Sequence, residues 1–543
     1  MAIKKYFATK NNTITNAFES NLVTRGTGAN MGLSDILEVF SIYGQAIQPS
    51  SSAHGRGSEK TAELSRVLVH FPVNEISTDR TNDDLPASGS VDFYLRLYNA
   101  KHGQTTPRSL NLEIAPISKT WEEGFGLDMD EYQDITRDVE GSNWVKSAAD
   151  TDWTTPGGDY LTSSVFTTTL DKGTEDLEIN ITEIVEEWIS SDGYTNYGLG
   201  IKLTDSQEAY FDQTAGHLTP PAGATTGSVL HNPSGAKRSY YTKKFFGRGT
   251  EFFFKKPAIE ARWDSATKDQ RGEFFYSSSL ASEQENINTI YFYNYFRGQL
   301  RNIPGIDSKG SAVYVQIYSG STQPGESALD LILPGGASST VVTGGYESVG
   351  VYTASFALTA SEPQLTTLFD VWLSGTVSDA AGGGTTLHTG SIKPKTIGAS
   401  NFNPSPEYVT TITNLKSKYY TSENPTFRLF IREKNWCPTV YTRATDTAVG
   451  TTIEDGYYKL LRAADNAEIL PFGTGTATAP QSAGTAGSYT RMSYDISGSY
   501  FDYDMSLLEP GYMYGLKFAY FINGSYVEQP QIFKFRVEEL EDQ

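Results

Sequence analysis

The sequence predicts a mainly β protein built from several β-sandwich domains, and three observations support this fold class. Aromatic residues make up 13% of the chain and are accompanied by 50 glycines, a composition that favours strands joined by tight turns over helices. Short apolar runs of strand length recur at regular intervals. The 543 residues are too many for one core, and at about 100 to 200 residues per domain they predict roughly three.

Residues 1–30 are polar and contain glycine, and only 11–18 looks ordered. We therefore predict an N-terminal arm. Two alternatives stay open: the arm is disordered, or it is an extended strand that becomes ordered against a partner.

The first domain should begin behind the arm, with strands expected at 36–43, 66–71, 91–97 and 110–114. The run VLVHF at 67–71 predicts a strand that is buried on both faces. His70 lies in this run, and no second His or Cys is near it in the sequence. We expect His70 to be a packed strand residue and not a catalytic one.

One short amphipathic helix is expected after these strands. Apolar residues recur there at the spacing of one helix face, at Ile181, Ile184, Val185, Trp188 and Ile189. Either Asn180 or Thr182 can cap its N-terminus, and Glu183 follows Asn180 at the distance of a capping box. The apolar stripe is predicted to pack in the core.

The first domain continues with a strand at 199–203 and a Pro- and Gly-rich loop at 217–236, and the polar run at 277–288 predicts its end. Beyond this run, further strands are expected at 313–318, 350–356, 368–373, 426–431, 457–461, 492–496, 512–521 and 532–537. They have the spacing of two seven-strand, immunoglobulin-like sandwiches. The predicted divisions are an arm at 1–30 and domains at 31–283, 290–400 and 405–543.

The excess of acidic over basic residues limits the classes of partner that the chain can bind. The chain has 64 acidic and 43 basic residues and a formal charge of −21, a field that repels phosphate backbones, so no nucleic acid is expected. Surplus carboxylate should instead keep the protein soluble and discourage association through strand edges.

The single cysteine, Cys437, leaves no internal disulfide or cysteine-based metal site, and we expect folding in a reducing cytoplasm. No apolar segment has the length of an export signal, and none approaches the roughly 20 residues of a membrane span. We expect neither export nor membrane insertion.

The richest candidate region for binding is 121–196, where tryptophan, glycine and carboxylate are dense. Four aromatic residues there could form a platform that stacks on sugars, namely Trp121, Trp144, Trp153 and Tyr160. The favoured interpretation is that these large rings, beside glycine turns, plug the open end of a sandwich.

A calcium site is a second possibility in this region. Asp128, Asp130 and Asp134 could place hard oxygen ligands around Ca²⁺. A neighbouring loop could add a carboxylate from Asp150, Asp152 or Asp159. The loop lacks the glycine and glutamate positions of an EF-hand, so the favoured alternative is solvated, turn-capping aspartates and no cofactor.

Catalysis is not expected. The 6 histidines are scattered, and none lies in a nucleophile-elbow, zinc-ligand or phosphate-loop context. A carboxylate pair such as Glu122 and Asp159 could act as acid and base on a glycoside. Among so many carboxylates, however, some pair always looks plausible.

Several motifs resemble the DNRLRE-type jelly roll, a family of carbohydrate-binding-module-like β domains. They are SRVLVHF at 65–71, ISKTWEEG at 117–124, DWTTP at 152–156, INITEIVEEW at 179–188 and NYGLGI at 196–201. The resemblance rests on their order and spacing and covers roughly 35–263. It implies an N-terminal jelly-roll sandwich with one short helix, followed by the two immunoglobulin-like β-sandwiches.

Two further runs are similar to forms found in structural proteins of tailed phages of marine bacteria. They are GLDMDEYQD at 126–134, with Asn143 and Trp144 after it, and YFDYDMSLLEPGYMYG at 500–515. This resemblance implies a non-enzymatic virion protein that is made and folded in the host cytoplasm. It would be an adaptor or fibre-like component of tail, baseplate or neck, with other virion proteins and copies of itself as partners.

Two rival functions remain. The first is an adhesin that binds a host surface polysaccharide through Trp121, Trp144 and Trp153. The second, weaker one is a glycan-cleaving enzyme.

Overall fold

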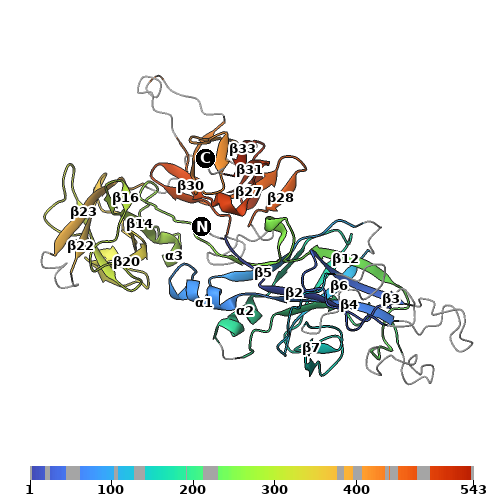
Figure 1. The fold of residues 1–543 in the computed structure, drawn as a ribbon. Coiled ribbons are helices and arrows are strands. Elements are labelled where there is room, and N and C mark those ends of the chain that lie inside the picture. The colour runs from blue at the N-terminus through green and yellow to red at the C-terminus, as the bar shows by residue number, and fades with distance from the viewer. Residues whose placement is uncertain are drawn as a thin grey trace, which may run out of the picture. The chain divides into compact units, whose positions relative to one another are not determined.

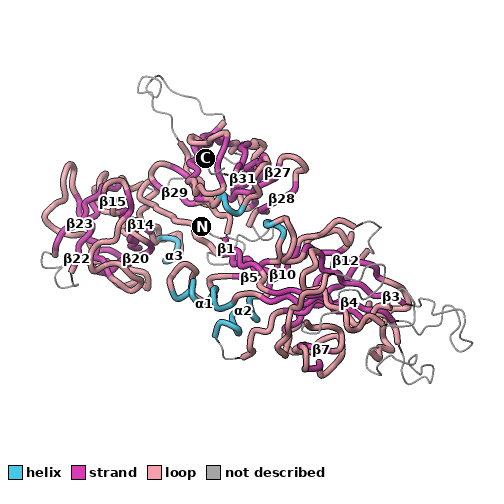
Figure 2. Tube along the Cα trace, viewed as in Figure 1, coloured by secondary structure: helices cyan, strands magenta, loops and turns pink. Residues whose placement is uncertain are grey.

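The computed structural model describes residues 3–18, 25–43, 62–102, 108–127, 141–190, 193–211, 230–375, 384–395, 406–434, 440, 450–473 and 489–539. The protein is mainly β, as predicted, and Figure 2 shows far more strand than helix. It folds as two units. The N-terminal unit is Ala2–Asp264 with Ser482–Tyr489, and the C-terminal unit holds Ser265–Gln481 and Thr490–Gln543. The segment 265–283, which the sequence analysis assigns to the first domain, therefore groups with the later strands.

The N-terminal unit contains two antiparallel sheets (Figure 1). The four-stranded sheet has the order β1 (Ile3–Phe7), β13 (Ala258–Arg262), β5 (Asp92–Leu97) and β10 (Leu177–Asn180). The seven-stranded sheet has the order β12 (Tyr240–Phe246), β3 (Ile36–Tyr43), β4 (Ala62–His70), β11 (Leu199–Leu203), β6 (Leu110–Pro116) and β9 (Phe166–Leu170), with β2 (Lys10–Thr15) paired to β4. A small hairpin joins β7 (Lys146–Ala148) and β8 (Thr151–Asp152).

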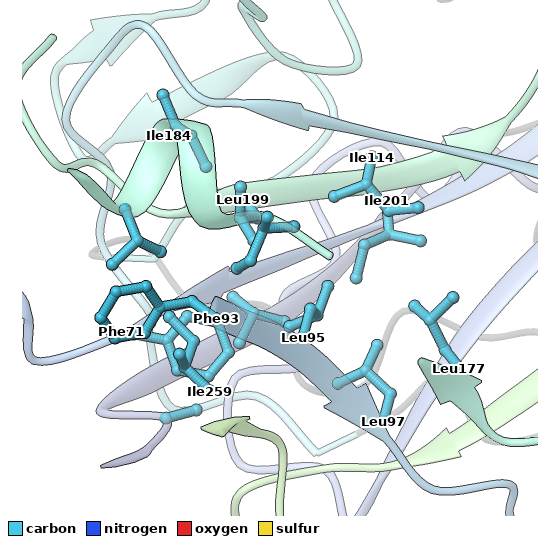
Figure 3. Packing of buried hydrophobic residues seen from close by; sticks show 14 of the residues in the cluster. Phe71, Phe93, Leu95, Leu97, Ile114, Leu177, Ile184, Leu199, Ile201 and Ile259 are labelled. Carbon is cyan, nitrogen blue, oxygen red and sulfur yellow. The ribbon is translucent and has the colours of Figure 1, made fainter. Parts of the chain in front are cut away.

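The main core of this unit lies between its two sheets. Strand β5 alternates, so that Phe93, Leu95 and Leu97 are fully buried. Figure 3 shows Leu95 in the same cluster as Leu199 and Ile201 of the opposite sheet. Each such side chain contributes about 1.5 to 3 kcal/mol when it leaves water. This shared core holds the two sheets together.

Helix α2 (Thr182–Ser190) confirms the predicted amphipathic helix, and Ile184, Val185 and Trp188 are buried. The Thr182 amide donates to Asn180 Oδ1 at 2.9 Å, so Asn180 supplies an N-terminal cap. Two further helices, α1 (Val73–Thr81) and the single-turn α3 (Glu283–Asn286), are not predicted by the sequence pattern. Helices α1 and α2 lie side by side (Figure 1). Among the described residues, no helix is long and apolar enough to cross a membrane.

The predicted N-terminal arm is wrong for the described residues 3–18. Strand β1 pairs with β13 from Ile3 to Phe7, and β2 pairs with β4 from Lys10 to Thr15. Neither strand needs a partner protein in order to become ordered, because each is hydrogen-bonded within its own chain. The N-terminus therefore contributes one strand to each sheet.

The C-terminal unit contains two β domains. The first has the sheet order β14 (Asn288–Tyr293), β21 (Val351–Phe356), β20 (Val342–Ser348), β17 (Ala312–Ser319), β22 (Leu368–Ser374) and β23 (Thr385–Ile392). Two short hairpins accompany it, β15 (Tyr295–Phe296) with β16 (Gln299–Leu300), and β18 (Leu331–Ile332) with β19 (Ser338–Ser339). Its core includes the fully buried Tyr352 and Trp372.

The last domain is formed by two sheets. One has the order β24 (Tyr408–Ile412), β26 (Thr426–Glu433), β30 (Gly498–Asp502) and β29 (Ser493–Asp495). The other has β25 (Lys418–Tyr420), β33 (Phe533–Glu538), β31 (Met513–Ile522), β27 (Gly456–Arg462) and β28 (Ala467–Leu470), with β32 (Ser525–Glu528) on β31. Stacked rings join the two sheets, since Phe501 of β30 packs 4.1 Å from Tyr458 of β27.

One segment connects the two domains of the C-terminal unit. The Asp269 amide donates to Tyr494 O of β29 at 3.0 Å, and the Gln270 amide donates to Thr289 O of β14 at 2.9 Å. Arg271 then forms two hydrogen bonds with the fully buried Asp370, at 2.6 and 2.8 Å. The segment is thus hydrogen-bonded to both domains.

Candidate functional site

The tryptophan cluster lies on the outer face of the seven-stranded sheet. Strand β4 is buried on both faces, as the sequence predicts: Val67 and Val69 face the main core, whereas Leu64 and Leu68 contact the tryptophans. Trp144 is fully buried, and Trp121 and Trp153 are 3% and 4% exposed. The rings are core residues, but they cover a sheet face and do not plug the open end of the sandwich.

The polar atoms of two of these rings are used internally. Trp121 Nε1 donates to Tyr197 O at 2.7 Å, and Trp153 Nε1 donates to Asn143 O at 2.9 Å. A platform that stacks on sugars needs an exposed ring face, and none of the three tryptophans offers one. The structure therefore contradicts the platform interpretation of Trp121, Trp144 and Trp153.

Tyr160, the fourth residue of the predicted platform, belongs to a buried ion-pair cluster. Arg66 donates from Nε and Nη2 to the two carboxylate oxygens of Glu208, at 3.0 and 2.8 Å. The Arg66 guanidinium lies over the rings of Trp144 and Tyr160, at 5.4 and 5.7 Å from their centroids. Burial raises the pKa of Tyr160 to about 12. Its hydroxyl donates to Gly157 O at 2.8 Å and stays protonated at neutral pH.

Glycine is required where the backbone approaches these rings. Gly157 has φ +88°, and a Cβ there would come within 2.9 Å of Trp144. At Gly200, in β11, a Cβ would lie 2.0 Å from the Tyr160 ring. Side chains at either position would force the cluster apart, so the loop and strand glycines are part of its packing.

A buried amide network beside the tryptophans was missed by the sequence analysis. In β2, Asn12 donates from Nδ2 to Ser142 O at 2.8 Å and accepts from the Met31 amide at 2.9 Å. Asn30 donates to Ser142 O and to Glu123 O, both at 2.8 Å. Both asparagines are fully buried. The network ties β2 to three loops that are remote in sequence.

The neighbouring Asn11 completes this network. Asn11 Nδ2 donates to Gly32 O at 3.0 Å, and its backbone amide donates to Glu123 Oε1 at 2.8 Å. Glu123 in turn accepts two hydrogen bonds from Arg248, at 3.1 and 2.7 Å. A local signal existed in the polar run KNNTIT, but its residue types are typical of an exposed turn, and only distant partners explain its burial.

The predicted calcium ligands Asp128, Asp130 and Asp134 lie outside the described residues. In the part of the chain that the structure describes, no group of three or more His, Cys, Asp or Glu residues is arranged to hold a metal. Of the carboxylates expected to assist, Asp159 instead accepts the Thr154 and Thr155 amides, each at 2.8 Å. Asp159 therefore caps a turn.

The other residues weighed for chemistry also have structural partners. Glu122 Oε2 accepts the Ala149 amide at 3.2 Å, so both carboxylates of the pair weighed for glycoside hydrolysis bind backbone amides. His70 ends β4, and its Nδ1 lies 2.7 Å from Thr9 Oγ1. Burial, together with the charge of Lys10, lowers the pKa of His70. These contacts hold loops and strands in place.

Comparisons with known proteins identify no family for this chain. No protein-family model matches the chain. No curated protein matches it. Among solved structures, the chain is similar to the crystal structure of a chicken TCR at 13% identity and a TM-score of 0.15, covering 46% of this chain and 93% of that one. At this TM-score the similarity supports no conclusion about fold or function.

Proposed function

We propose that the chain is a non-enzymatic structural protein of a tailed-phage particle, an adaptor or fibre-like component of tail, baseplate or neck that acts by protein–protein assembly. The resemblances at 126–134 and 500–515 motivate the class of particle. The single structural observation that supports the proposal is the closed Arg66 and Glu208 pair among buried tryptophans. Beside the buried tryptophans, these two charged side chains bind each other and so stiffen the fold.

A rigid interior suits an assembly component, because partners then bind a surface that needs little reordering on contact. In this proposal the protein folds in the host cytoplasm and is incorporated into the virion with other virion proteins and copies of itself. The adhesin alternative needs Trp121, Trp144 and Trp153 as exposed stacking residues, but all three are buried. No observation in the described residues favours it over assembly.

The proposal is tested on particles. Phage are purified by density gradient, washed in high salt, and analysed by quantitative mass spectrometry beside the major capsid protein. We expect the chain at a fixed, integral ratio to that protein, with density for its three β domains in a reconstruction of the particle. Recovery of the chain only from lysate, and never from washed particles, would exclude a virion role.

A further inference from the structure

An exposed aromatic patch with two lysines lies on the N-terminal unit. We call it the phenylalanine–lysine patch and define it by Phe7, Phe246, Phe252, Phe253, Lys255 and Lys256. Phe252 is 40% exposed and Phe253 is 50% exposed. Their rings pack against two edge strands: Phe253 lies 4.8 Å from Phe7 at the end of β1, and Phe252 lies 5.5 Å from Phe246 at the end of β12.

The lysines of the patch have rings as neighbours instead of carboxylates. Lys255 Nζ lies 4.7 Å from the centroid of Phe252, and Lys256 Nζ lies 5.4 Å from that of Phe253. Within the described ranges, neither lysine forms an ion pair with an acidic residue. By contrast, Lys244 on the neighbouring β12 is paired with Glu38 at 2.7 Å. The patch is thus locally cationic on a chain whose formal charge is −21.

This composition is typical of an interface centre. Exposed aromatic rings held by their neighbours lose little side-chain entropy on binding, and aromatic and cationic residues carry most of the energy of many interfaces. Two copies of this chain repel each other through their net charge. A stable contact between copies must therefore set a cationic region against carboxylates, and the patch offers such a region.

We propose that the phenylalanine–lysine patch is the docking surface for a second copy of this chain, whose contacting surface carries an apolar side chain flanked by carboxylates. The apolar side chain covers Phe252 and Phe253, and the carboxylates pair with Lys255 and Lys256. This inference rests on the proposed assembly function and gives it a partner and a surface.

The test is the mass of the full-length chain in solution, measured by sedimentation velocity and light scattering across a wide concentration range. Wild type should self-associate. Phe252→Ser with Phe253→Ser should raise the dissociation constant at least about tenfold, because each truncation removes a central anchor. Lys255→Glu with Lys256→Glu should do the same. Circular dichroism of both variants must match wild type, as expected for the exposed Phe252 and Phe253 and the half-buried Lys255 and Lys256.

Two controls are matched to these variants. Tyr295→Ser with Phe296→Ser removes a more exposed aromatic pair, 63% and 56% exposed, from the C-terminal unit. Lys101→Glu with Lys393→Glu changes the net charge by the same amount at exposed lysines elsewhere. Both should associate as wild type does.

Three outcomes overturn the inference. They are a monomeric wild type at every concentration, equal association of the patch variants and wild type, or patch-dependent binding to anionic vesicles without self-association. None of these outcomes bears on the proposed function. That function is contradicted by a different result, the absence of the chain from washed particles.

Discussion

Arg66 of β4 and Glu208, beyond the end of β11, form a two-fold hydrogen-bonded ion pair in which each side chain is only 6% exposed. Arg66 Nη1 also donates to Gly157 O at 3.0 Å, so the same guanidinium holds the loop that lies against Trp144. Burial alone would lower the pKa of Arg66, but the carboxylate of Glu208 outweighs it and raises that pKa. Arg66 therefore stays charged inside the unit.

Arg66→Ala should lower the free energy of unfolding of the N-terminal unit by about 3 to 5 kcal/mol, because Glu208 is left as an uncompensated buried charge. The double variant Arg66→Met with Glu208→Leu should lose less, since it removes both charges and keeps apolar volume. Urea unfolding followed by tryptophan fluorescence measures both. Lys434→Ala, at an exposed pair with Glu407, is the control and should cost under about 1 kcal/mol. Equal losses for the single and double variants would contradict this account.

Strand β2 should be indispensable to the N-terminal unit. Asn12→Ala leaves the buried Met31 amide without its partner and removes one of the two hydrogen bonds to the Ser142 carbonyl, at a cost of about 1 to 3 kcal/mol. Hydrogen exchange should speed up in 10–15 and 141–147 together, because one side chain joins them. Asn74→Ala, on the exposed side of α1, is the matched control. An Asn12→Ala chain with unchanged exchange would show that the Asn12 side chain does not hold these two segments together.

The spacing of apolar residues along the sequence was enough to predict much of the fold. Strand β22 and helix α2 were placed because their apolar spacing is itself the reason they are buried. Helix α1 was missed because only Val73 and Ile76 of its nine residues are buried, which leaves too weak a stripe to detect. Its position is fixed instead by Arg80, which donates twice to Glu186 of α2 at 2.6 Å.

The candidate site was less predictable because its contacts join distant parts of the chain. The apolar run of β4 showed that both faces are covered, but it could not show that Trp121 and Trp153 supply the outer cover. The polar side chains of Asn11 and Asn12 give no local sign of burial, because their burial depends on Gly32 and Ser142. A single sequence does not record such pairings.

Acid should weaken the N-terminal unit through Glu260 of β13. Burial by itself would raise the pKa of Glu260, but the charges of Lys5, Arg262 and Arg96 outweigh it and hold that pKa at about 2. The Glu260 carboxylate lies 2.6 Å from Arg262 Nη2 and 3.3 Å from Lys5 Nζ. Since the folded pKa is below the ordinary value of 4.5, this stabilisation is present above that value and is lost as pH falls toward 2.

Glu260→Gln should therefore be less stable than wild type at neutral pH, by roughly 3 kcal/mol at most, and the difference should shrink as pH falls from about 4.5 to 2. Urea midpoints of the N-terminal unit measured across this range give the difference directly. Glu407→Gln, at a largely exposed pair, should show little pH-dependent difference. A Glu260→Gln deficit that stays constant down to the lowest pH would mean that lost packing, and not lost charge, explains the effect.

Asp269, in the segment that connects the two domains of the C-terminal unit, should act in the opposite sense. The residue is 4% exposed, and burial raises the pKa of Asp269 to about 6, although the charge of Arg271 and the Arg271 amide, 3.1 Å from Oδ1, partly oppose the shift. Tyr291 and Asp495 also face it. A raised carboxyl pKa means that the folded unit favours the protonated acid. Asp269 therefore weakens the fold as pH rises from 3.8 through 6.

Asp269→Asn keeps an oxygen acceptor for the Arg271 amide and removes the buried charge. At neutral pH the variant should be more stable than wild type, by at most about 3 kcal/mol, and this gain should vanish near pH 4, where wild type is protonated. Thermal unfolding of the C-terminal unit at the two pH values measures the gain. Asp465→Asn, at a surface pair with Arg462, is the control, because the pKa of Asp465 is lowered and not raised. A variant less stable than wild type at neutral pH would show that the Asp269 carboxylate is held by Arg271 strongly enough to overcome its burial.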